Sequence, residues 1–169
     1  MNHILNYVRN RAANAQPVSV IYIAWVNPIY VAGNSSFIGY YITLVGGYDP
    51  FSGMYPTVTP SQLITANPDY IIASDFMGNY NATLQAILSI PGINNTYAVK
   101  ENHIYILGNL AQDLVQEPGP LSVYGALMLA MILHPSAFGL NSTEVPHYVS
   151  DQWVVQYVRP NLNLTLSGG

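Results

Sequence analysis

The sequence predicts an α/β fold, a Rossmann-like three-layer α/β/α sandwich with a mostly parallel central sheet. Two observations predict it. Apolar runs rich in β-branched residues occur at 18–25, 70–74 and 103–107, and such runs are typical of strands buried on both faces of a parallel sheet. Segments with helix signals lie between these runs, and alternating strands and helices indicate a sheet covered on both sides.

The first half of the chain gives local signals for each element. Residues 3–14 have apolar side chains at helical spacing, which predicts a short amphipathic helix. The first strand should end at the Asn27-Pro28 turn. Ser35 or Ser36 can cap a helix that runs to Val45, and 48–58 is expected to be a loop.

Turn and cap signals continue along the rest of the chain. Thr59-Pro60 predicts an N-cap followed by proline at the first helical position. The segment 67–69 is a turn that leads into the second strand. Asp69 in this turn is expected to be a turn former rather than a catalytic acid. We expect helices at 81–89, 119–133 and 149–158, a loop at 108–118, and a polar tail at 159–169.

Composition excludes several classes of protein. Half of the 169 residues are hydrophobic and 7% are charged, so the chain has enough apolar surface to fold. The longest apolar stretch, 126–133, is shorter than the roughly 18 residues that indicate a membrane-spanning helix. A net charge of −4 with four Lys and Arg argues against nucleic acid as a partner. The absence of cysteine excludes a disulfide scaffold.

The surface must therefore be polar and uncharged, which points outside the cell. Five asparagines begin an Asn-x-Ser/Thr glycosylation sequon: Asn34, Asn81, Asn94, Asn141 and Asn163. Coincidence in an asparagine-rich chain is the alternative explanation. We expect an extracellular protein, associated with the cell surface in its full-length form. Low charge also suits an acidic exterior, where carboxylates are partly protonated.

No pattern in the sequence predicts catalysis. The four histidines (His3, His103, His134 and His147) are scattered along the chain, and no two of them have the close spacing of paired metal ligands. Neither a Gly-x-Ser-x-Gly elbow nor a phosphate-binding Gly-x-x-x-x-Gly-Lys loop is present. The acidic residues show no paired spacing. We therefore expect no enzyme, no metal site and no cofactor.

Aromatic and amide side chains follow each of the three predicted strands. In parallel α/β sheets, ligands lie beyond the carboxyl ends of the strands. These side chains should share one edge and form an aromatic, weakly polar surface for a bulky ligand. The predicted ligand-binding residues are Trp25, Asn27, Tyr30, Phe76, Tyr80, Asn109, Gln112 and Asp113. The alternative for each aromatic ring is that it packs on its own domain.

Three segments carry a resemblance to a known family. They are YVAGNSSFIGYYITLVGGYDP at 30–50, VTPSQLITANPDYIIAS at 58–74, and AVKENHIYILGNL with EPGPLSVYGALMLAMILHP within 98–135. In order and spacing they resemble the C-terminal lobe of the solute-binding proteins of ABC importers for iron–siderophore, haem and cobalamin. Those proteins have two lobes joined by one long helix, and the likeness covers about residues 15–158.

The resemblance implies a domain plan and a function. Residues 1–16 would be the end of the inter-lobe helix, 17–158 the solute-binding lobe and 159–169 the tail, with the N-terminal lobe missing. The lobe would hold a bulky metal chelate with its strand-end aromatic residues and pass it to a membrane permease. Exposed inter-lobe surface would favour self-association of the isolated lobe.

Two departures from the family pattern affect the expected docking. A glutamate of the short helix after the variable loop commonly docks on the permease in this family, and the matching position here is Ser61. The family's Pro-Gly-Pro is often flanked by arginine, whereas Glu117 and Leu121 flank it here. Ser61 and the sequons favour a second interpretation, a structural or adhesive cell-surface domain of the same fold. A direct zinc or manganese receptor is a third, for which only Asp75 and Asp113 stand at strand ends.

Overall fold

The computed structural model describes residues 18–116, 122–141 and 145–158. Its strands form one sheet of seven: β1 (Val18–Val26), β2 (Ile29–Val31), β3 (Gly47–Tyr48), β4 (Thr57–Val58), β5 (Tyr70–Ser74), β6 (Ile104–Leu107) and β7 (Tyr148–Val149). The order is β4-β2-β1-β5-β6-β7, and β3 pairs with β1. The pairs β1–β5, β5–β6, β6–β7 and β1–β3 are parallel, and the pairs β1–β2 and β2–β4 are antiparallel. The predicted mostly parallel sheet is confirmed.

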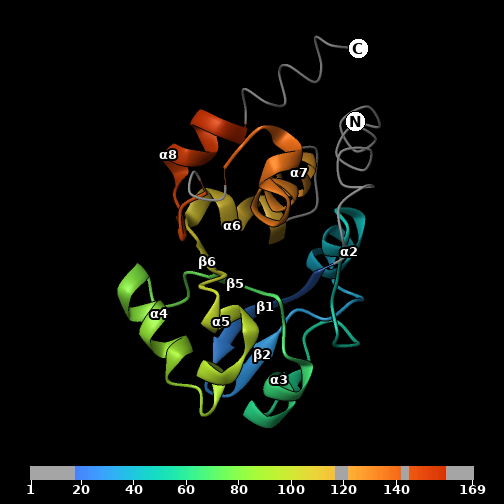
Figure 1. The fold of residues 1–169 in the computed structure, drawn as a ribbon, viewed down its shortest axis with the longest axis vertical. Helices are drawn as coiled ribbons and strands as arrows, with labels where there is room; N and C mark the ends of the chain where they lie inside the picture. Colours follow the sequence, from blue (N-terminus) through green and yellow to red (C-terminus); the bar gives the residue numbers. More distant parts are fainter. Residues whose placement is uncertain (1–17, 117–121, 142–144, 159–169) are drawn as a thin grey trace.

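Helices cover both faces of this sheet, as predicted (Figure 1). One face carries α2 (Phe37–Leu44), α6 (Asn109–Gln116), α7 (Ser122–Leu133) and α8 (Asp151–Trp153). The other carries α3 (Pro60–Ala66), α4 (Tyr80–Leu88) and α5 (Tyr97–Lys100). Single turns η1 (Ile93–Asn95), η2 (Pro135–Phe138) and η4 (Val154–Val158) complete the described elements. None of the described helices is both long and apolar enough to cross a membrane.

Successive side chains of a strand point to opposite faces of the sheet, and this divides the core into two clusters. In β1, Tyr22 contributes to the cluster under α2 and α7, while Ile21 and Ile23 contribute to the cluster on the α3–α4 face. This is the period of two expected of strands covered on both sides. The apolar helix α7 is buried along its described side chains from Gly125 to Leu133, as its continuous hydrophobicity predicts.

Predicted caps fix where the helices start. Ser36 accepts a hydrogen bond from the Gly39 amide and begins α2. Thr59 and Gln62 form a reciprocal capping box at the start of α3, with Pro60 at its first position. These side-chain bonds satisfy amides that the first helical turn leaves unpaired.

The predicted loop at 108–118 is wrong. Residues 109–116 form α6, because Leu110, Ala111, Leu114 and Val115 repeat at helical spacing and pack into the core beside α7. The short strands β2, β3, β4 and β7 also went unpredicted, and the helix expected at 149–158 is shorter, starting at Asp151. The helix expected at 3–14 and the tail at 159–169 lie outside the described residues.

A loop at 49–56 holds the segment that enters α2. Backbone hydrogen bonds run from the amide of Gly33 to the carbonyl of Met54 (2.7 Å) and from the amide of Asn34 to the carbonyl of Phe51 (2.8 Å). At the start of the loop, the buried Asp49 accepts a bond from the Phe51 amide through Oδ1, and its Oδ2 has no partner. Burial raises the pKa of Asp49 from its ordinary 3.8 to about 7, against the opposing effect of the Phe51 bond.

The raised pKa predicts a specific pH dependence of stability. The folded chain binds the Asp49 proton more tightly than the unfolded chain, so folding gains stability below about pH 4 and loses it as pH rises to about 7. Asp49→Asn should remove this loss of unfolding free energy, which is on the order of 2–4 kcal/mol. The measurement is urea unfolding at pH 4.5 and at pH 8. Ser52→Ala in the same loop serves as the control and should keep the wild-type dependence. Parallel pH curves for the wild type and Asp49→Asn would refute the assignment.

Candidate functional site

The strands β1, β5, β6 and β7 are parallel, so they end on one side of the sheet, here called the carboxyl edge. Register fixes this alignment: Ile23 lies beside Ala73, and Ala73 beside Ile106. Beyond the strands, the Asp75 amide donates to the Leu107 carbonyl (3.2 Å) and the Gly108 amide to the Val149 carbonyl (2.8 Å). The ends of β5, β6 and β7 are therefore tied side by side.

Three of the predicted aromatic residues converge at the β1 end of this edge. The rings of Trp25 and Phe76 are in edge contact, with centroids 5.3 Å apart and planes at 65°. Tyr30 lies directly opposite Trp25 in the β1–β2 pairing. The Trp25 Nε1–H donates to the carbonyl of Asn27 at 3.0 Å, which orients the indole. Trp25 and Tyr30 remain 40% and 39% exposed, enough for an incoming ring to stack on them.

A second aromatic pair lies at the ends of β5 and β7. Tyr80, at the start of α4, contacts Tyr148 edge-on, with centroids 5.8 Å apart. Asp75 lies nearby and accepts a 2.6 Å hydrogen bond from the buried hydroxyl of Thr83. Burial raises the pKa of the Tyr148 hydroxyl, and the carboxylates of Asp75 and Asp151 raise it further. The carboxylates of Asp75 and Asp151 therefore lie within electrostatic range of this ring pair.

The last three predicted residues belong to a helix. Asn109, Gln112 and Asp113 share the outer side of α6, where the first and last are exposed and the second is half-buried. Asp151 accepts a hydrogen bond from the amide of Leu110 (2.8 Å), which connects the start of α6 to α8. Asn109 follows the end of β6 after one residue, while Asp113 lies one turn farther along α6. The correction of the loop to a helix thus places Asp113 farther from the edge.

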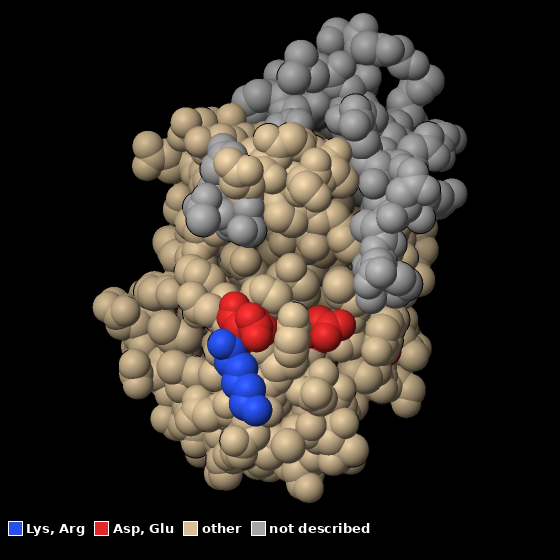
Figure 2. Space-filling view, in the orientation of Figure 1, with Lys and Arg blue, Asp and Glu red and all other residues tan. Residues whose placement is uncertain are grey.

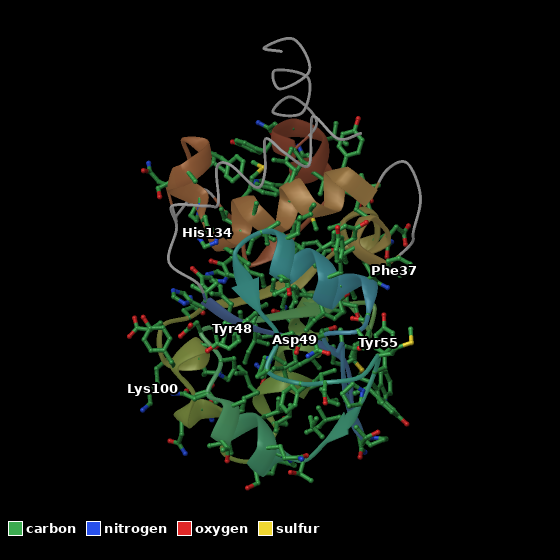
Figure 3. All side chains as sticks on the ribbon, turned by 90° about the vertical axis from the view of Figure 1, so that its right-hand side faces the viewer. Phe37, Tyr48, Asp49, Tyr55, Lys100 and His134 are labelled. Carbon is green, nitrogen blue, oxygen red and sulfur yellow. The ribbon has the colours of Figure 1, made fainter. Side chains whose placement is uncertain are left out.

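Sequence reasoning missed an aromatic group at the same edge. Phe37 and Tyr40 are exposed on α2, and Met54 and Tyr55 are exposed on the loop beside its start. A hollow of about 470 Å³ is lined by Ser35, Ser36, Phe37, Tyr40, Tyr41 and Met54. Figure 3 shows Phe37 and Tyr55 on the same side of the molecule. The signal was present in the sequence: the exposed side of the predicted helix carries aromatic rather than polar residues.

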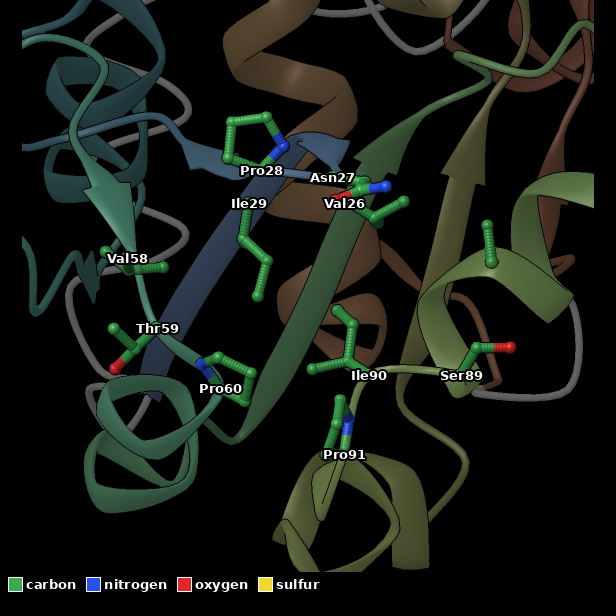
Figure 4. A pocket seen from close by; sticks show the side chains of 11 residues that line it. Val26, Asn27, Pro28, Ile29, Val58, Thr59, Pro60, Ser89, Ile90 and Pro91 are labelled. Atoms are coloured by element: carbon green, nitrogen blue, oxygen red, sulfur yellow. The ribbon is translucent and has the colours of Figure 1, made fainter.

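An apolar groove opens below the β1–β2 turn (Figure 4). It has a volume of about 570 Å³ and runs between the start of α3 and the end of α4. Its lining contains no charged side chain: Val26, Asn27, Pro28, Ile29, Val58, Thr59, Pro60, Ala86, Ser89, Ile90 and Pro91. Asn27 belongs to both the groove and the carboxyl edge. Ser61, the predicted docking residue, is exposed on α3 directly after Pro60.

The described histidines lie away from the carboxyl edge. His103 stacks on Tyr70 (4.4 Å) and His147 on Tyr105 (5.2 Å), at the sheet edge where the strands begin. Both use Nδ1 against a backbone carbonyl, and His134 uses Nε2 against the carbonyl of Val45. The Asp69 carboxylate accepts a hydrogen bond from the amide of Ser19 (2.9 Å), which ties the start of β5 to β1. No three His, Asp or Glu side chains gather as a metal cluster in the part of the chain that the structure describes.

The sequon asparagines within the described residues are all exposed: Asn34, Asn81, Asn94 and Asn141. Asn163 lies outside the described residues. Asn81 directly follows Tyr80, and Asn34 precedes α2, so two of the four lie beside the carboxyl edge. Glycosylation itself stays a prediction.

The Trp25–Phe76 contact is testable by a double-mutant cycle. Trp25→Leu and Phe76→Leu should show a coupling energy of about 0.5–1.5 kcal/mol in urea unfolding, because each variant removes the same ring–ring contact. Trp25→Leu combined with Tyr97→Leu, on α5, is the matched control and should be additive within about 0.5 kcal/mol. A Trp25–Phe76 coupling no larger than the control would contradict the geometry.

Comparison with known proteins gives a family and a fold. The model of the family described as periplasmic binding protein matches residues 1–111. No curated protein matches the chain. Among solved structures, the vitamin B12 binding protein BtuF of Vibrio cholerae is 22% identical (TM-score 0.61), covering 80% of this chain and 51% of that one.

Two further solved structures have the same fold. The haem-binding protein RhuT from Roseiflexus sp. RS-1 is 19% identical (TM-score 0.69), covering 80% of this chain and 53% of that one. A possible iron-binding solute-binding protein from Staphylococcus epidermidis is 22% identical (TM-score 0.67), covering 79% and 52%. The chain thus spans about half the length of the structures it matches. The matched family model and the parallel sheet agree: the chain belongs to the periplasmic binding protein family.

Proposed function

We propose that this chain is the C-terminal lobe of an extracellular receptor that captures a bulky metal chelate and delivers it to an ABC permease. The observation that carries the proposal is the aromatic carboxyl edge, where Trp25 meets Phe76 and Tyr80 meets Tyr148. Exposed rings at the ends of parallel strands suit a ligand held by stacking and a few hydrogen bonds. Two of the structural neighbours are named for binding vitamin B12 and haem, ligands of this bulky kind.

In this proposal the lobe makes and breaks no bond. A second lobe, absent from this chain, closes over the ligand from the other side, and the closed receptor docks on the permease. The exposed start of α3, with Ser61, and the apolar groove beside it supply an uncharged docking surface. Membership of the periplasmic binding protein family supports binding rather than catalysis and a place outside the cytoplasm.

A structural or adhesive role on the cell surface is the second candidate. It is favoured by Ser61 at the docking position and by Asn34 and Asn81, whose glycans would crowd the carboxyl edge. Peptide mapping of the secreted protein decides between the two. Glycans at Asn81 support the adhesive role, and unoccupied Asn81 supports the receptor. A direct zinc or manganese receptor has the least support, since the described residues hold no cluster of three metal-type ligands.

Ligand capture is measurable with a single fluorophore. Trp153 is nearly buried and stacks on Tyr157, so Trp153→Phe leaves Trp25 as the only tryptophan. Titration with haem, cobalamin and ferric siderophores should quench Trp25 with a Kd of roughly 10 μM to 1 mM, because one lobe contacts one side of the ligand. Tyr30→Ala should weaken this binding several-fold, whereas Tyr97→Ala on α5 should not. Binding at nanomolar Kd would show that a second lobe is unnecessary.

The exposed aromatic edge also predicts self-association. Two copies can bury their carboxyl edges against each other, since contiguous exposed rings mark interaction surfaces. Light scattering over a concentration series should show a weak dimer. Phe37→Ser with Tyr40→Ser should shift it to monomer, while Thr65→Ser on α3 should not. A monomer at all concentrations would refute this prediction.

A further inference from the structure

We infer that the carboxyl edge binds a neutral or positively charged ligand more tightly than an anionic one. The inference rests on the proposed function, because it assigns a ligand class to the same face. It follows from where the described carboxylates, the described cation and the aromatic rings lie in the fold.

Two carboxylates are built into the edge. Asp75 follows β5, and its Oδ1 accepts a 2.6 Å bond from the Thr83 hydroxyl. Asp151 starts α8, and its Oδ1 accepts a 2.8 Å bond from the Leu110 amide. Each side chain is thus fixed by the secondary structure that it caps or contacts. The carboxylates of Asp75 and Asp151 both act electrostatically on Tyr148, and the ring of Tyr148 contacts the ring of Tyr80. A ligand placed on this ring pair meets a negative field.

No described cationic side chain lies at this edge to offset that field. Of the four Lys and Arg in the sequence, Lys100 is the one within the described residues. It ends α5, ahead of β6, and so lies at the opposite edge of the sheet. Figure 3 shows Lys100 and Tyr48 on one side of the molecule and Phe37 and Tyr55 on the other. Figure 2 shows a basic side chain beside acidic side chains on the face that it displays.

The rings add to this preference. The face of an aromatic ring carries negative charge and attracts a cation within about 6 Å. A carboxylate or catecholate group laid on Tyr80, Tyr148 or Trp25 would lose water without gaining a cationic partner from the residues that the structure describes. The geometry therefore favours chelates such as ferric trihydroxamates, which are neutral at the metal, over ligands that carry free carboxylates.

The test uses one chelate in three charge states. A linear ferric trihydroxamate with a pendant ammonium group is cationic, its N-acetyl form is neutral, and its N-succinyl form is anionic. With Trp153→Phe protein and Trp25 quenching, the cationic form should bind about tenfold more tightly than the anionic form, and the neutral form should lie between them. Raising the salt concentration should narrow this ratio.

Asp75→Asn with Asp151→Asn should reduce the ratio to about threefold or less. Asparagine keeps the Oδ1 acceptor for Thr83 and Leu110, so the fold is retained. Glu101→Gln, beside Lys100, makes the same kind of charge change at the opposite edge and should leave the ratio within about twofold of its original value. If the anionic form binds as tightly as the cationic form, the charge preference is wrong, but ligand binding at the carboxyl edge is not contradicted. Failure of all three forms to bind at millimolar concentration overturns the proposed function and the inference with it.

Discussion

The parallel register of β1, β5, β6 and β7 is the constraint on which the rest of the structure depends. Because these strands are buried on both faces, a slip of one residue would turn the apolar side chains of a strand to the wrong side. The register therefore determines which residues emerge together where the strands end. Trp25 and Phe76 are about fifty positions apart in the sequence, yet their rings touch because β1 and β5 end in line. The same alignment brings Asp75 beside β6 and Tyr148 beside Tyr80.

Much of the fold was predictable because its signals are local. The long apolar strands and the caps at Ser36 and Thr59 depend on side chains within a few residues of each other. The short strands β2 and β4 were not predictable, since two or three residues carry no period and their pairing partners are distant. The helix α6 follows β6 after a single residue and was mistaken for a loop. Its apolar residues have helical spacing, but its polar residues also suit a loop that contacts a ligand.

The candidate site was predictable only in outline. The rule that ligands lie beyond the carboxyl ends of parallel strands selected Trp25, Tyr30, Phe76 and Tyr80 from the order of elements alone. It could not find Phe37, Tyr40, Met54 and Tyr55, because their exposure depends on how α2 and the 49–56 loop pack. Nor could it show that Lys100 and the carboxylates of Asp75 and Asp151 lie at opposite edges, since that requires the topology.

A crystal structure of the chain soaked with a neutral ferric trihydroxamate tests the central claim most directly, because the anomalous signal of iron locates the ligand without ambiguity. The account predicts one iron peak at the carboxyl edge, with the chelate against the rings of Trp25, Phe76 or Tyr80. Iron in the groove lined by Pro28, Pro60 and Pro91, or beside the His103–Tyr70 stack at the opposite edge, would contradict it.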